Sequence, residues 1–211
     1  MGIVPVVPAV EHAFAPGAGA RAVVLVEGIS DRIALETLAS RRGRDLDPEG
    51  VAVVAIGGAQ AIGRHLDLYG PRGLGLTLAG LCDAGEEREF RRGLERAGLG
   101  GDLTRTAMET LGFYVCEADL EDELIRALGT DAVERVVETQ GEQRSFRTFR
   151  KQPAQRERST AAQLRRFMGT RSGRKIHYAA LLVDALNLTR VPRPLDLVLA
   201  HVRPRATAPQ E

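Results

Sequence analysis

Four short apolar runs, each followed by a helical pattern, organise the chain between residues 21 and 128. The runs are rich in Val, Leu and aromatic residues and have the continuous apolar character of strands covered on both faces. They occupy residues 23–26 (VVLV), 51–56 (VAVVAI), 76–81 (LTLAGL) and 112–116 (GFYVC). This alternation predicts an α/β fold with a mostly parallel four-stranded sheet, right-handed crossovers and helices on both faces.

The rest of the chain has helical patterns only. They cover residues 131–140, 161–168, 173–187 and 194–202, with an Arg-rich loop among them. We therefore expect a flexible leader at 1–20, the α/β domain at 21–128, a helical, Arg-rich extension at 129–205 that packs on the same domain, and a tail at 206–211.

An acid ends the first apolar run, where packing alone does not require one. Glu27 follows four apolar residues, and Asp31 lies four residues further on. Ser30 is a plausible N-cap for the next helix, and Gly43 lies where that helix should stop. The two acids therefore flank one strand-to-helix turn, at the edge of an open α/β sheet where ligands bind. The alternatives are a capping or ion-paired Glu27 and an Asp31 that only complements the helix dipole.

Further acids follow the third and fourth runs. Asp83 comes directly after the third run, and Asp119 and Glu121 begin the helix after the fourth. Because parallel strands present their carboxyl ends on one side, these acids and Glu27 should converge in one cleft. Clustered carboxylates repel one another unless a cation joins them, and oxygen ligands suit Mg²⁺ or Mn²⁺, which predicts phosphoryl transfer. A turn-forming Asp83 and a solvated helix face bearing Asp119 and Glu121 are the structural alternatives.

Positive charge is concentrated in one segment, although the net charge is only +1. Residues 144–175 contain eleven Lys or Arg and one acid, giving +10, whereas residues 1–143 contain 14 basic and 24 acidic residues, giving −10. This asymmetry predicts a polyanion-binding segment attached to a part that needs carboxylates. The nucleic-acid-binding candidates are Arg144, Arg147, Arg150, Lys151, Arg165, Arg166, Arg171 and Arg174. Phe146 and Phe149 lie among them and either stack on bases or anchor the segment to the core.

Composition is ordinary for a globular protein, with 44% hydrophobic and 27% charged residues. No apolar stretch approaches the roughly 20 residues that span a bilayer, and no signal peptide is recognisable, so we expect a cytoplasmic protein. Cys82 and Cys116 are expected to be buried apolar residues rather than a disulfide. The histidines lack zinc spacing, residues 57–65 lack the Lys and Ser or Thr of a phosphate loop, and no GxSxG motif occurs.

Three motifs resemble the Toprim domain, the metal-dependent fold of topoisomerases, bacterial primases and OLD-type (overcoming lysogenization defect) nucleases. They are VVLVEGISD with its Glu-Gly turn, Gly57-Gly58 after the second run, and LCDAG at the end of the third. The EGxSD form is most similar to the OLD branch. The resemblance covers residues 21–128, with a weaker extension to Lys175, and implies a stand-alone Toprim nucleotidyl transferase/hydrolase domain.

The resemblance also implies roles for individual residues. Catalytic roles fall on Glu27, Asp83 and Lys175, and metal ligation falls on Glu27, Asp31, Asp83 and Glu121. One position departs from the family, because the usual Asp-x-Asp after the third strand is Asp83-Ala84-Gly85 here. Glu86 or Glu87 could supply the missing carboxylate one register later, so Glu86 joins the expected metal ligands.

We therefore expect a Mg²⁺- or Mn²⁺-dependent nuclease that acts on nucleic acid, on DNA rather than RNA. The alternative is a Toprim module of weak or no activity that binds nucleic acid or docks a partner ATPase. Primase-like nucleotidyl transfer is a third interpretation, for which the sequence shows no dedicated NTP site. Because OLD-type nucleases usually carry an ATPase domain, the resemblance implies a stand-alone module or one that works with a separately encoded ATPase.

Overall fold

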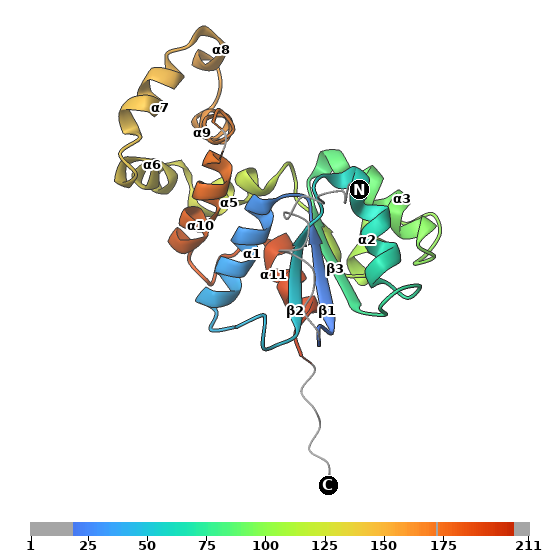
Figure 1. Ribbon diagram of the computed structural model, residues 1–211. Coiled ribbons are helices and arrows are strands. Elements are labelled where there is room, and N and C mark those ends of the chain that lie inside the picture. Colours follow the sequence, from blue (N-terminus) through green and yellow to red (C-terminus); the bar gives the residue numbers. More distant parts are fainter. Residues whose placement is uncertain (1–18, 172, 205–211) are drawn as a thin grey trace, which may run out of the picture.

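A single parallel sheet forms the centre of the molecule. The computed structural model describes residues 19–171 and 173–204, so the expected leader and tail lie almost wholly outside the described residues. Four strands pair in the order β2-β1-β3-β4 (Figure 1). They are β1 (Ala22–Val26), β2 (Val51–Ala55), β3 (Thr77–Cys82) and β4 (Phe113–Val115). All pairings are parallel, and helices cover both faces, so the predicted fold is confirmed.

β1 lies inside the sheet, and all five of its residues are apolar and fully buried. β2 and β3 flank it, with Val26 opposite Ala55 on one side and Leu81 on the other. Successive side chains point to opposite faces of the sheet, so Val24 joins one apolar cluster and Leu25 the other. The sheet therefore separates two cores, and both depend on the same strand.

Helices from both ends of the chain share one face of the sheet. They are α1 (Ile29–Arg41), α5 (Leu120–Leu128), α10 (Arg174–Ala185) and α11 (Arg193–His201). α1 packs along α10, although the two are far apart in sequence. The opposite face is covered by η2 (Ala59–Ala61), α2 (Ile62–Tyr69), α3 (Glu87–Arg96) and α4 (Arg105–Thr110), and η3 (Ala84–Glu86) leads from β3 into α3.

The segment between α5 and α10 forms a helical arm that projects from the sheet (Figure 1). Its helices are α6 (Thr130–Thr139), α7 (Gln143–Arg150), α8 (Pro153–Arg156) and α9 (Thr160–Met168). The sequence predicts an Arg-rich loop here, and that prediction is wrong, because α7 and α8 are helical. Phe146 and Phe149, one turn apart on α7, are buried against Phe167, with ring centroids 5.1 and 5.6 Å from it. Two phenylalanines among polar residues make an apolar stripe that is too narrow to predict the helix from the sequence. Because both rings are buried, they anchor the arm rather than stack on bases.

Cys82 and Cys116 lie in the interior, one in each apolar cluster, and both thiols are free. The prediction that they are buried apolar residues is confirmed. Within residues 19–171 and 173–204, every helix is too short or too polar to cross a bilayer.

Gly80 on β3 is required by the close approach of neighbouring side chains. A Cβ at this position would lie 2.5 Å from Cδ1 of Phe113 and 3.0 Å from the Leu25 carbonyl oxygen. We expect Gly80→Ala to lower the free energy of unfolding, measured with urea, by about 1–3 kcal/mol, because the added methyl overpacks the core. Gly101→Ala places its methyl in open space and should change that free energy by less than about 0.5 kcal/mol. Equal effects of the two substitutions would contradict this account.

Candidate active site

The acids that follow β1 and β3 meet at the carboxyl edge of the sheet. Because β1 and β3 are neighbouring parallel strands, Glu27 and Asp83 leave the sheet side by side. The backbone N–H of Asp83 donates a hydrogen bond of 2.7 Å to Oε1 of Glu27. The structure therefore brings together two strand ends that are 56 residues apart in the chain.

Asp31 lies beside this pair, in the first turn of α1. That helix begins at Ile29 with Gly28 as its N-cap, so the predicted N-cap role of Ser30 is wrong. Oδ2 of Asp31 accepts a hydrogen bond of 2.9 Å from the Gly28 N–H. Because the Asp31 side chain reaches back to the cap residue, the helix starts without the Ser30 hydroxyl. The same bond holds the Asp31 carboxylate next to the Glu27-Gly28 turn.

Burial and mutual repulsion raise the pKa of all three carboxyls. Burial raises the pKa of Glu27, and the charges of Asp31 and Glu86 raise it further. Burial also raises the pKa of Asp31 to about 6, with a contribution from the charge of Glu121. The pKa of Asp83 rises to about 7, again mainly through burial, and the charges of Glu27 and Asp31 add to it. Carboxylates that raise one another's pKa face a common space, where a cation would reverse the shifts.

Glu121 and Lys175 reach the same site from α5 and α10. Glu121 is only 5% exposed, and its Oε2 accepts a hydrogen bond of 2.8 Å from Nζ of Lys175. Burial acts to lower the pKa of Lys175, but this bond and the charge of Glu121 outweigh it, so the pKa is raised. Lys175 therefore carries its positive charge at neutral pH, and that charge also acts on Glu27 and Asp31.

Glu86 is the nearer substitute for the carboxylate missing after Asp83. It lies in η3, and its charge contributes to the raised pKa of Glu27. Glu87 instead accepts hydrogen bonds from the guanidinium of Arg105. Of the two candidates, Glu86 is therefore the one whose charge reaches the site.

Asp119 adds charge to the site while serving a structural role. Its Oδ1 caps α5 by accepting a bond from the Asp122 N–H, and its Oδ2 pairs with Nε of Arg165 at 2.6 Å. Its charge also raises the pKa of Asp83. The sequence presents Arg165 only as a nucleic-acid contact, because no local signal reveals an ion pair between residues 46 positions apart.

The donor set suits a divalent cation with oxygen ligands. Among the described residues, no group of three or more His, Cys, Asp or Glu side chains is arranged so that it could hold a metal ion. Three of the acids instead accept hydrogen bonds from the protein: Glu27 from the Asp83 N–H, Asp31 from the Gly28 N–H, and Glu121 from Lys175. The charges of the expected ligands Glu27, Asp31, Asp83, Glu86 and Glu121 nevertheless act on one another, so a divalent ion would relieve repulsion that burial strengthens.

The structure divides the predicted nucleic-acid-binding residues into three groups. Arg174 is 6% exposed and lies over the Phe167 ring at 4.0 Å, so its side chain is held mainly by the protein, contrary to the prediction of a free nucleic-acid contact. Arg150 and Arg165 are partly engaged in ion pairs with acids of the chain. The remaining candidates are exposed: Arg144, Arg147, Lys151, Arg166 and Arg171. For these five and for Arg150 and Arg165, nucleic-acid binding stays a prediction.

Comparisons with known proteins agree with this arrangement. Residues 20–84 match the family model "Overcoming lysogenization defect protein-like, TOPRIM domain". The C-terminal region of the Xanthomonas campestris pv. campestris OLD protein is similar, with a TM-score of 0.65 and 25% identity over 87% of this chain and 95% of that chain. The C-terminal region of the Burkholderia pseudomallei OLD protein has a TM-score of 0.65 and 20% identity over 87% and 96% of the two chains, which shows the fold alone. No curated protein sequence matches the chain.

The raised pKa of Asp83 makes the stability of the metal-free protein depend on pH. The folded state holds the Asp83 proton up to a pKa of about 7, whereas 3.8 is the ordinary value, so the free energy of unfolding should fall as pH rises between these values. Allowing for partial exposure, we expect a loss of about 1–2 kcal/mol between about pH 4.5 and 7.5 in wild type relative to Asp83→Asn. Urea unfolding across this range measures the difference, and Asp67→Asn, a substitution on the surface that keeps Asp83, should retain the pH dependence of wild type. A difference between wild type and Asp83→Asn that does not change with pH would contradict the assignment.

Proposed function

We propose that this chain, which carries an OLD-like Toprim domain, is a metal-dependent phosphodiester hydrolase that acts on nucleic acid. The main support is the hydrogen bond from the Asp83 N–H to Glu27, because it joins the acid-bearing ends of two neighbouring strands. Asp31 and Lys175 lie near enough to change the pKa of Glu27. A carboxylate cluster with one lysine suits phosphoryl transfer assisted by Mg²⁺ or Mn²⁺.

The residues divide the chemistry among them. Glu27, Asp31, Asp83, Glu86 and Glu121 would hold the metal. When bound, the ion would polarise the phosphate and favour deprotonation of an attacking water. Oε1 of Glu27 accepts the Asp83 N–H, so the other carboxylate oxygen would be placed to accept a proton close to the reacting phosphate. Lys175, protonated and held by Glu121, would donate hydrogen bonds to phosphate oxygens as negative charge develops.

The exposed cations of the arm would hold the nucleic acid. Arginine guanidinium groups donate paired hydrogen bonds to phosphate, so binding should weaken steeply as salt concentration rises. We propose DNA rather than RNA as the substrate and a separately encoded ATPase as a partner, both on the resemblance to OLD-type nucleases.

A second candidate function rests on Gly85. The carboxylate that the Toprim pattern places here is absent, and the structure shows open space where its Cβ would lie. With one ligand fewer, the site would bind a second ion weakly or not at all. The chain would then be a module of weak or no activity that binds nucleic acid or docks a partner ATPase.

Glu27→Gln separates the two functions. The amide keeps an oxygen that accepts the Asp83 N–H, so the fold should persist, while the lost charge and proton acceptor should reduce Mg²⁺- or Mn²⁺-dependent cleavage of DNA at least about 100-fold. Glu117→Gln is a matched control, because Glu117 also follows a strand but its side chain is 71% exposed. Cleavage that is equal in wild type and Glu27→Gln would refute the proposed hydrolase. Salt-sensitive DNA binding without cleavage by wild type would favour the inactive module.

Gly85→Asp tests the missing ligand directly. Gly85 does not have a positive φ, and a Cβ there meets no atom within 4 Å, so the substitution should be tolerated. We expect the added carboxylate to tighten Mn²⁺ binding, measured by calorimetry, by about tenfold, or about 1.4 kcal/mol. Gly101→Asp adds the same charge in open space away from the acids and should leave the affinity unchanged. An unchanged affinity in Gly85→Asp would show that this position does not face the metal.

A further inference from the structure

The helical arm contains a pocket with an excess of positive charge. It has a volume of about 600 Å³ and lies between α7 and the turn that joins α9 to α10. Three arginines line it: Arg144, Arg171 and Arg174. The Ser145 hydroxyl adds a hydrogen-bonding group, whereas the hydroxyls of Thr148 and Thr170 donate to the backbone carbonyls of Arg144 and Phe167. None of the described lining residues is acidic.

The charge of Arg174, one of these three arginines, is neutralised by Glu142, an acid that does not line the pocket. Arg174 pairs with Glu142 at 2.8 Å, and the Tyr178 hydroxyl donates to the other Glu142 oxygen at 2.8 Å. Burial acts to raise the pKa of Glu142, but these bonds outweigh it and the pKa is lowered, so Glu142 is ionised. Arg144 and Arg171 are exposed, and no acid of the described chain lies within ion-pair distance of either. Three guanidinium groups and one carboxylate leave the pocket with a net charge of +2.

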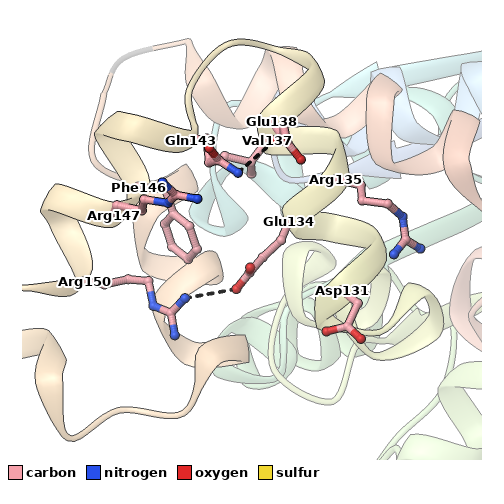
Figure 2. Close-up of a pocket in the computed structure, with 9 residues that line it drawn as sticks. All are labelled: Asp131, Glu134, Arg135, Val137, Glu138, Gln143, Phe146, Arg147 and Arg150. Atoms are coloured by element: carbon pink, nitrogen blue, oxygen red, sulfur yellow. Dashed lines mark hydrogen bonds and ion pairs between the residues drawn. The ribbon is translucent and has the colours of Figure 1, made fainter.

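A second pocket, on the opposite side of α7, has a balanced set of charges (Figure 2). It has a volume of about 320 Å³. Its charged lining residues are Asp131, Glu134, Glu138, Arg135, Arg147 and Arg150. Arg150 reaches across to Glu134 at 3.2 Å, and the three acids balance the three arginines. α7 therefore has one electrically neutral side and one positive side.

We infer that the positive pocket binds a phosphate monoester at the end of a nucleic-acid strand. A monoester carries close to two negative charges at neutral pH and matches the net charge of +2, whereas a diester inside a strand carries one. Guanidinium forks and hydroxyls are the donors that phosphate oxygens require. Arg174 lines the pocket, and the next residue, Lys175, contacts Glu121, so neighbouring residues of α10 connect the pocket with the candidate active site. The inference rests on the proposed function only for the choice of a nucleic acid as the ligand.

The test measures binding without metal, so that no cleavage is needed. The full chain in EDTA is titrated into labelled single-stranded oligonucleotides with a 5′-phosphate, a 3′-phosphate or hydroxyls at both ends, and binding is followed by fluorescence anisotropy. We expect one phosphorylated strand to bind about tenfold more tightly than the hydroxyl strand, and Arg144→Gln and Arg171→Gln to abolish that preference. Both side chains are exposed, so the variants should fold, which thermal melting checks. Arg135→Gln makes the same charge change in the neutral pocket and should keep the preference.

Two outcomes would overturn the inference. Equal affinity for phosphorylated and hydroxyl strands would exclude a monoester site, and a preference that survives in both pocket variants would place the site elsewhere. Competition with adenosine 5′-monophosphate distinguishes the source of the phosphate: if the mononucleotide binds as tightly as the phosphorylated strand, the assignment to a strand end is wrong. Failure in metal-free binding leaves the proposed hydrolase untouched, because that function is judged by metal-dependent cleavage and the Glu27→Gln variant.

Discussion

The parallel pairing of β1 with β3 is the constraint on which the candidate site depends. It sets Glu27 and Asp83 side by side, and the Asp83 N–H then donates to the Glu27 carboxylate. Partly buried acids near one another repel, and burial and this repulsion raise the pKa values of Glu27, Asp31 and Asp83. Hydrogen bonds from backbone N–H groups to Glu27 and Asp31 offset part of the increase. A site that gathers acids in this way is poised for a cation, and this links the fold to the proposed chemistry.

The C-terminal helices are part of the site rather than an accessory to the sheet. α10 packs along α1 and also against α5, and these contacts place Lys175 beside Glu121 and within electrostatic reach of Glu27. Arg174, one residue earlier, is buried and bonded to Glu142 and to the Phe167 carbonyl, which fixes the arm to the start of α10. Two adjacent basic residues therefore have different tasks, because successive residues of a helix point in different directions.

The residue that departs from the Toprim pattern, Gly85, lies where the structure accepts either a glycine or a residue with a carboxylate. Gly85 has open space around it, so nothing in the packing requires a glycine or excludes a carboxylate. Glu86 lies in the same turn, and its charge already acts on Glu27. The difference between an active centre and a binding module therefore rests on how many ligands this turn supplies, not on the fold.

The sequence by itself determined that four strands alternate with helices in a mostly parallel sheet, and at which edge of that sheet the acids lie. These follow from local rules, because apolar runs define buried strands and parallel strands end on one side. It also indicated Glu27, Asp31 and Asp83 as neighbours, since each is tied to a strand end or a first helical turn. Only the tertiary structure decided which basic residues are available. Arg174 is buried, Arg165 pairs with Asp119, and α7 occupies the place of the expected loop. Each of these features depends on contacts between segments that are distant in the chain, and such contacts leave no periodic signal in the sequence.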